Sequence, residues 1–256
     1  MRVVIALGGN ALLRRGQPLD TELQRANLRE AATAIAEVAD EHQIVVTHGN
    51  GPQVGLLALQ AEAYEDAPAP PLDVLGAESE GMVGYLIDQE LSNALPDRQV
   101  VTLLTQVEVD PHDPAFDHPT KPIGPFYDAD RAARLEQQRN WQFGEYDGGF
   151  RRIVPSPEPR RIRELDTIRV LLQADRIVVC AGGGGIPVVV TPARAVRGVE
   201  AVIDKDRSAA LLAARLNAHA LLLLTDVPGV YPTWPAPDAE MLGRCTPDDL
   251  EALKLE

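Results

Sequence analysis

A lysine between two aspartates stands at the start of one predicted helix, in the stretch VIDKDRSAALLAARL from Val202 to Leu216. Lysine suits a phosphate ligand, because its ammonium is a compact charge on a flexible stem. A flanking carboxylate restrains such a stem and favours its charged form. Lys205 could therefore be a phosphate clamp that Asp206 orients, with Asp204 only as a solvated neighbour, although a solvated loop can show the same pattern. The anion-binding features of the rest of the chain decide between a phosphate clamp and a solvated loop.

Three glycine-rich turns each follow a predicted strand, and their sequences are ALGGNAL, THGNGPQ and CAGGGGIPV. Glycine lets the backbone approach an anion closely, and a helix N-terminus offers it unpaired N–H groups. A single turn of this kind is more often a tight turn and nothing more. Open α/β sheets bind ligands beyond the carboxyl ends of their strands, where all three turns stand. Together they predict an anion-binding crevice.

The common glycine fingerprints of nucleotide sites do not occur. The sequence contains no GxxxxGK[ST] loop. The glycines from Gly182 to Gly185 match no GxGxxG register, and no acidic residue ends a following second strand as a dinucleotide site requires. Phosphate binding by this chain would therefore use neither common motif.

The elements that must position these turns alternate along the chain. Short apolar runs predict strands, and longer runs with apolar residues three or four apart predict helices. This alternation favours a mostly parallel sheet between helices, a three-layer α/β/α sandwich. Thr21 with Gln24 resembles a helix-capping box. The predicted strands are 3–7, 43–47, 99–107, 176–180 and 220–225, and the predicted helices begin near 21, 52, 73, 164 and 205.

The composition changes from Asp110 to about Arg163, where the chain is rich in proline, charge and aromatic residues. Proline at this density disfavours a central strand or a long helix. Loops of this length without a function are uncommon, so the segment predicts an inserted, protruding subdomain, at about 110–163. We expect two lobes, residues 1–165 and residues 166–256.

Composition limits the partners and the compartment. The 256 residues carry a net charge of −14, which argues against nucleic acid or an anionic membrane as the partner. The apolar runs VVIAL and LLLL are too short for a signal peptide or a membrane span. The two cysteines, Cys180 and Cys245, form no disulfide framework or zinc motif, so we expect a cytoplasmic protein.

Nine sequence blocks, in order along nearly the whole chain, closely resemble the carbamate kinase family, which has the amino acid kinase fold. The blocks PTKPIGPFY and GVEAVIDKDRSAALLA are the most specific. The others are VIALGGNALL, VTHGNGPQVGLL, LDVLGAESEGMVGY, LLTQVEVDPHDPAF, RRIVPSPEPRRI, CAGGGGIPVV and LLLLTDVPGVY. The resemblance implies reversible phosphoryl transfer between ATP and carbamate, which yields ADP and carbamoyl phosphate.

The resemblance also implies the roles of individual residues. Lys121, in the inserted subdomain, and Lys205 would contact the transferred phosphate, and Asp206 would hold the lysines in place. Substrate and phosphate would be bound by Gly8, Gly9, Asn10, Gly49, Asn50, Gly51, Gly182 and Gly183. Nucleotide would be bound by Gly184, Asp226, Val227 and Tyr231.

By the same resemblance the protein is a homodimer that acts on small molecules. The sequence shows no dedicated metal cage, so Mg²⁺ is expected to arrive on ATP. The chain ends at LEALKLE, without the serine-methionine-glycine-proline-lysine stretch that family members carry. That departure predicts a C-terminal truncation and weaker nucleotide binding.

Several residues have plainer alternatives. Asp206 could serve only as a helix N-cap. Lys121 could be an exposed loop lysine, and Asn50 could simply tolerate turn geometry. His48 invites a general-base role, but carbamate oxygen is already anionic, so a structural hydrogen bond is favoured. For the whole chain, the alternatives are a kinase of this fold that acts on another small acid, or a catalytically impaired nucleotide-binding protein.

Overall fold

The structure is a computed structural model that describes residues 1–13, 17–64, 66, 68–146, 148–225, 227, 229–232 and 240–253. It divides into two compact units, Met1–Leu224 and Thr225–Glu256. The second unit contains the helix α8 (Pro247–Leu253), and within it the Leu242 N–H donates to the Val230 carbonyl over 2.7 Å. All other elements belong to the first unit.

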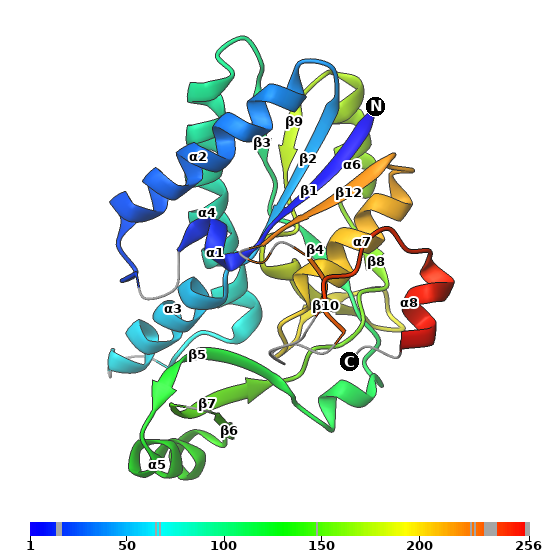
Figure 1. Cartoon of the computed structure of the whole chain (residues 1–256). Coiled ribbons are helices and arrows are strands. Elements are labelled where there is room, and N and C mark those ends of the chain that lie inside the picture. The colour runs from blue at the N-terminus through cyan, green and yellow to red at the C-terminus, as the bar shows by residue number, and fades with distance from the viewer. Residues whose placement is uncertain are drawn as a thin grey trace. The chain divides into compact units, whose positions relative to one another are not determined.

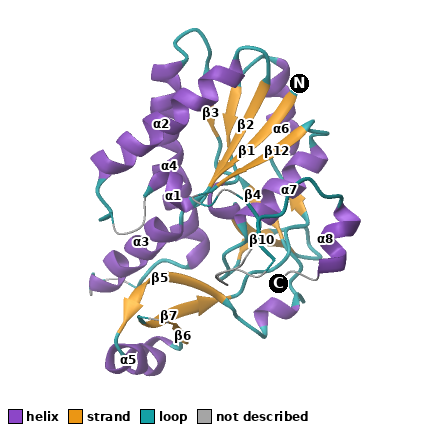
Figure 2. Ribbon diagram, in the orientation of Figure 1, coloured by secondary structure: helices purple, strands orange, loops and turns teal. Residues whose placement is uncertain are grey.

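The first unit is built on a five-stranded sheet in the order β12-β1-β2-β9-β3, and all of its strand pairs are parallel (Figures 1 and 2). Helices lie between the consecutive strands of this sheet along the chain, because a parallel pair needs a long crossover connection. The strands are β1 (Arg2–Leu7), β2 (Gln43–His48), β3 (Val100–Thr102), β9 (Ile177–Val179) and β12 (Ala220–Leu224).

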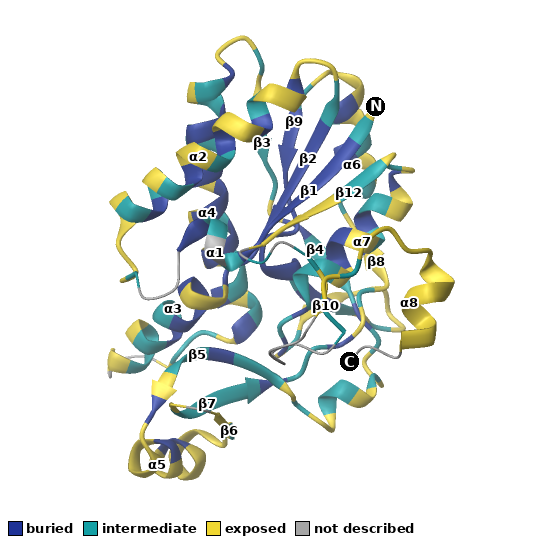
Figure 3. Cartoon of the chain, in the orientation of Figure 1, coloured by how far each residue is buried: buried dark blue, intermediate teal, exposed yellow. Residues whose placement is uncertain are grey.

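The strands β1, β2 and β9 are buried on both faces, while the edge strand β12 is partly exposed. Successive side chains of a strand point to opposite faces, so each buried strand contributes to two layers of core. Ile5 and its neighbours on one face pack against α2 (Thr21–Ala39) and α4 (Leu72–Ala94). Val4 and its neighbours on the other face pack against α6 (Leu165–Gln173) and α7 (Lys205–Arg215). Figure 3 shows β1, β2 and β9 as buried ribbons between these helices. The predicted three-layer α/β/α sandwich is confirmed.

Two local predictions were wrong. The cap of α2 is Asp20, whose side chain accepts from the Leu23 N–H over 3.0 Å, and Thr21 is the first helical residue and not the cap. Residues 99–107 do not form one strand, since β3 is followed by a break and then by β4 (Gln106–Glu108). The break exists because the Thr105 N–H donates to the Glu80 carboxyl group instead of continuing the ladder.

The strand β4 belongs to a second, four-stranded sheet, in the order β11-β10-β4-β8. Its β10–β4 pair is parallel, and its other two pairs are antiparallel. The remaining strands of this sheet are β8 (Arg161–Ile162), β10 (Ile186–Val190) and β11 (Val196–Gly198).

The proline-rich insertion forms a separate antiparallel sheet in the order β5-β7-β6, below α3 (Gly51–Ala63) in Figure 1. Tyr127 and two residues of α5, Ala132 and Leu135, form its small core. The insertion contains η1 (Pro114–Phe116), β5 (Lys121–Tyr127), α5 (Ala129–Arg139), β6 (Gln142–Tyr146) and β7 (Gly149–Val154). Lys121 is the first residue of β5, so the insertion presents it on a strand.

Candidate active site

The three glycine-rich turns lie side by side, because they follow β1, β2 and β9, which are neighbours in the central sheet. The first turn leads into α1 (Gly9–Leu12), the second into α3 (Gly51–Ala63), and the third is the short helix η2 (Gly182–Gly184). A Cβ atom on Gly49 would lie only 3.5 Å from the Gly9 nitrogen. Two turns that are 40 residues apart in the chain are thus in contact.

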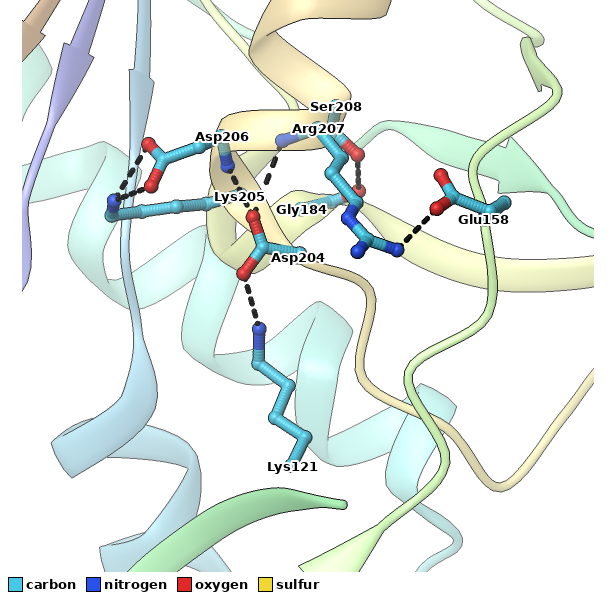
Figure 4. A network of polar contacts seen from close by, with 8 residues as sticks. All are labelled: Lys121, Glu158, Gly184, Asp204, Lys205, Asp206, Arg207 and Ser208. Atoms are coloured by element: carbon cyan, nitrogen blue, oxygen red, sulfur yellow. Dashed lines mark hydrogen bonds and ion pairs between the residues drawn. The ribbon is translucent and has the colours of Figure 1, made fainter. Parts of the chain in front are cut away.

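Lys205 reaches these turns from the first position of α7. Its Cδ atom lies 3.5 Å from the place that a Cβ on Gly49 would take. Its Nζ donates to both carboxylate oxygens of Asp206, over 2.7 and 2.8 Å (Figure 4). The side chain is 26% exposed, so the ammonium group is partly sheltered and keeps access to solvent. Asp206 therefore holds Lys205 directly, beside the second glycine turn.

Asp204 has two partners of its own, and it is not a solvated neighbour. Its Oδ1 accepts from the backbone N–H groups of Asp206 and Arg207 over 2.9 and 3.2 Å, so Asp204, and not Asp206, caps α7. Its Oδ2 lies 3.0 Å from the Nζ of Lys121. Burial alone would raise the pKa of Asp204, but Lys121 and the two N–H donors outweigh burial and lower it.

The third turn is shaped by close contacts that leave no room for side chains. Gly183, Gly184 and Gly185 have φ values of 65°, 91° and 87°, a region that favours glycine. A Cβ on Gly183 would lie 2.2 Å from the Asn50 amide nitrogen, and a Cβ on Gly184 would lie 2.5 Å from the Ile203 carbonyl. Asn50 therefore packs directly on this turn.

Two side chains support these turns from outside them. The Asn50 amide also donates to the Ser79 hydroxyl over 2.7 Å. The Ser208 hydroxyl donates to the Gly184 carbonyl over 2.7 Å, which ties the turn to α7. The third turn thus bridges the second turn and the helix that carries Lys205.

Glu80, on α4, is a residue that the sequence reasoning missed. Its Oε1 accepts from the Gly182 N–H over 2.9 Å, and its Oε2 accepts from the Thr105 N–H over 3.2 Å. Burial raises the pKa of Glu80 to about 8, against the opposing effect of these N–H donors. A glutamate that falls on the buried face of a predicted helix, beside Ser79 and Val83, was the available signal.

His48 shares this buried cluster, at the end of β2. Its Nδ1 is 2.9 Å from the Gly49 carbonyl, which is the structural hydrogen bond expected of it. Burial lowers the pKa of His48 to about 4, so the ring is neutral. A Cβ on Gly182 would lie 2.3 Å from the His48 Nε2, so the ring packs against the third turn. Glu80 and His48 together form the floor under the glycine turns.

The structure places the remaining predicted residues as follows. Gly8 donates its N–H to the Leu224 carbonyl over 2.8 Å, and Gly51 is the first residue of α3. Asn10 belongs to α1, and its side chain lies outside the described part of the chain, as does the whole of Asp226. Val227 and Tyr231 belong to the unit Thr225–Glu256.

The described ranges contain neither a candidate metal cluster nor a candidate membrane span. No three side chains of His, Cys, Asp or Glu gather there around a point that could hold a metal ion. Within the same ranges, every helix falls short of the length and apolar character that crossing a membrane requires.

The amino acid kinase family matches residues 1–255. A carbamate kinase of Rhizobium meliloti (strain 1021) is 55% identical over 96% of this chain and 77% of its own length. A carbamate kinase of Haemophilus influenzae is 51% identical over 99% of this chain and 82% of its own. The solved carbamate kinase from Giardia lamblia bound to AMP-PNP has a TM-score of 0.89 and 39% identity, over 99% of this chain and 82% of that one. The chain belongs to the amino acid kinase family and, within it, to the carbamate kinases.

Proposed function

We propose that this chain is an ATP-dependent carbamate kinase, which transfers a phosphoryl group reversibly between ATP and carbamate and yields ADP and carbamoyl phosphate. The observation that carries the proposal is the meeting of two lysine–aspartate pairs at the start of α7, next to the glycine turn after β2. The carbamate kinases that match nearly the whole chain support the choice of substrate.

Phosphoryl transfer requires the protein to position the reactants and to supply positive charge, and it requires little covalent chemistry. Lys205 and Lys121 supply that charge, and the backbone N–H groups of the glycine turns supply donors that need no reorganisation. Gly8, Gly9 and Asn10 are proposed to face the transferred group, with Gly49, Asn50 and Gly51 around the carbamate. Carbamate needs no base, because its oxygen is already an anion.

The nucleotide is proposed to bind near the third turn, at Gly182, Gly183 and Gly184, and at Asp226, Val227 and Tyr231. In this proposal residues 1–165 form the acceptor lobe and residues 166–256 the nucleotide lobe. The relative bound to AMP-PNP supports a site for ATP. We propose that Mg²⁺ is carried by the nucleotide, because Mg²⁺ usually binds substrate phosphates and keeps several waters. The free thiols of Cys180 and Cys245 support a cytoplasmic location.

We also propose that the chain forms a homodimer. Met82 and Tyr85 on α4 are exposed, as is Leu104, and Leu104 follows β3, an edge strand of the central sheet. Exposed apolar side chains beside an open strand edge favour a partner surface. Sedimentation should give a dimer mass for the wild-type chain and a monomer mass for Tyr85→Glu. A wild-type monomer at micromolar concentration would contradict this part of the proposal.

The reverse reaction tests the proposed function, because carbamate itself is unstable. The wild-type chain should form ATP from carbamoyl phosphate and ADP, and Lys205→Ala should lower kcat by about 100-fold. Undiminished turnover of Lys205→Ala would refute the clamp. A panel of acyl phosphates tests whether another small acid is preferred. ADP binding in a calorimeter without any ATP formation would favour the non-enzymatic alternative.

A further inference from the structure

Lys121 and Asp204 are 83 residues apart in the chain, yet their side chains form one hydrogen-bonded ion pair of 3.0 Å. Lys121 begins the first strand of the insertion, and Asp204 precedes α7. Their side chains are 26% and 38% exposed, so the pair is partly sheltered from water. Figure 4 shows Lys121 pointing from β5 up to the carboxylate. The contact links the insertion to the helix that carries Lys205.

The orientation of the Asp204 carboxylate is fixed by its second oxygen. Oδ1 accepts from the N–H groups of Asp206 and Arg207, so the group cannot turn away without uncapping α7. Oδ2 is then held toward Lys121. An exposed lysine stem has many rotamers, and a fixed carboxylate selects among them. The cap of α7 thereby sets where the Lys121 ammonium lies.

The same relation occurs two residues further on, where Asp206 holds Lys205. The Asp206 N–H donates to Asp204, so the two lysines and two aspartates form one connected chain of contacts. One lysine comes from the insertion and the other from α7. Resting on the function proposed above, we propose that Asp204 is a positioning residue that aims Lys121 at the transferred phosphate, as Asp206 aims Lys205.

Other contacts hold the insertion on the same stretch of chain. Glu158 pairs with Arg207, and the Val202 N–H donates to the Pro155 carbonyl over 3.0 Å. Arg152 lies 3.6 Å from the Glu200 carboxylate. These contacts remain when Asp204 loses its charge. The loss of charge should therefore change the orientation of the Lys121 side chain and leave the insertion in place. Glu158→Gln is the matched control, since it removes an ion pair across the same boundary without touching either lysine.

The test is Asp204→Asn, which keeps the size and the capping oxygen of the side chain but removes its charge. In the ATP-forming assay kcat should fall about tenfold, as expected for one charged hydrogen bond, while KM for ADP changes less than twofold. The melting temperature should stay within a few degrees of the wild-type value. Glu158→Gln should retain wild-type kcat. An Asp204→Asn enzyme with wild-type kcat would overturn the proposal.

A double variant separates positioning from any independent role of Asp204. Lys121→Ala with Asp204→Asn should be no slower than Lys121→Ala alone, because Asp204 acts only through Lys121. A loss of kcat in the double variant equal to the product of the two single losses would overturn the proposal. Should the Asn variant fail to fold by circular dichroism, Asp204→Ser retains a capping oxygen and replaces it in the same comparison.

One readout does not depend on turnover, so it separates this proposal from the proposed function. Acetic anhydride should modify Lys121 several-fold faster in Asp204→Asn than in the wild-type chain or Glu158→Gln, with the modified peptide quantified by mass spectrometry. An unchanged rate of modification would refute the Lys121–Asp204 link even in a chain that makes ATP. Absence of ATP formation by the wild-type chain, with faster modification in the variant, would refute the function and leave the link standing.

Discussion

The protonation state of Glu80 affects the stability of the site. The residue is 1% exposed, and burial raises the pKa of its carboxyl group from the ordinary 4.5 to about 8. Below pH 4.5 the group is protonated in both the folded and the unfolded chain. From pH 4.5 to about 8 only the unfolded chain ionises, so the free energy of unfolding falls as the pH rises. At neutral pH the floor of the glycine turns therefore contains a neutral acid.

We predict that this dependence is visible between pH 6.5 and pH 8. His48 acts in the opposite direction, but only below its ordinary pKa of 6.5, because its folded pKa is about 4. Between pH 6.5 and pH 8 the free energy of unfolding of the wild-type chain should fall by roughly 2 kcal/mol more than that of Glu80→Gln. Urea unfolding of both proteins at several pH values measures this difference.

Glu80→Gln should also be destabilised at every pH, because its amide NH₂ must face one of two N–H donors that the carboxyl group now accepts from. That cost lowers the free energy of unfolding equally at every pH. The slope of the free energy of unfolding against pH is unaffected, so this slope is the decisive readout. Parallel curves for the wild-type chain and Glu80→Gln would show that Glu80 is ionised in the folded protein.

Which single residues the sequence can predict depends on how far away their partners are. The Lys205–Asp206 contact joins neighbours in the chain, and the residue types suggested it. Asp204 was interpreted as a solvated neighbour because its partner, Lys121, is 83 residues away, on a strand of the insertion. Glu80 went unnoticed for the same reason, since it binds the backbone of Gly182, 102 residues later. Only the fold brings such partners together.

Among the elements, the contact between α3 and β5 sets how closely the insertion approaches the central sheet. A Cβ on Gly55 would lie 2.3 Å from the Cα of Gly124 and 2.9 Å from its nitrogen. Both obstacles are backbone atoms, which cannot move aside as a flexible side chain can. The two elements therefore touch backbone to backbone, and Lys121 lies three residues before this contact on the same strand.

Gly55→Ala should push β5 away from α3 and carry Lys121 with it. Because a misplacement of about 1 Å can cost about 100-fold in rate, we expect kcat to fall at least about tenfold with the helical content unchanged. The measurement is the ATP-forming assay together with circular dichroism.

Gly76→Ala on α4 is the matched control for Gly55→Ala. A Cβ there would meet nothing within 4 Å, so kcat should stay at the wild-type value and the chain should gain a little stability from the better helix former. Wild-type kcat in Gly55→Ala would mean that the position of the insertion is set elsewhere.

The elements themselves were largely predictable, because period and turn chemistry are local properties. The strands that carry the three glycine turns appear where the apolar runs predicted them, and these turns lie together as parallel strands require. The continuous strand over 99–107 was wrong because the apolar pattern persists while the chain passes from one sheet to another at Thr105. A hydrogen bond to Glu80 causes that break, and periodicity does not reveal it.

At the scale of the whole molecule, a net charge of −14 opposes the binding of anions such as ADP and carbamoyl phosphate. Lys121 and Lys205 act against this field at short range, and both are only 26% exposed. Salt screens distant, exposed charges strongly and partly buried ones less. Added salt should therefore screen the repulsion between the acidic surface and the anionic ligand before it screens the attraction by the two lysines.

We predict that kcat/KM for ADP rises as the ionic strength increases from about 0.01 M to about 0.15 M, where the Debye length shortens from about 30 Å to about 8 Å. A double variant, Glu37→Gln with Asp40→Asn, changes two exposed residues at the end of α2 and brings the net charge from −14 to −12. It should have the higher kcat/KM at low salt and a smaller rise. An uncharged osmolyte of equal viscosity controls for diffusion. A kcat/KM that falls from the lowest salt onward would mean that the two lysines, and not the acidic surface, dominate the field that the nucleotide meets.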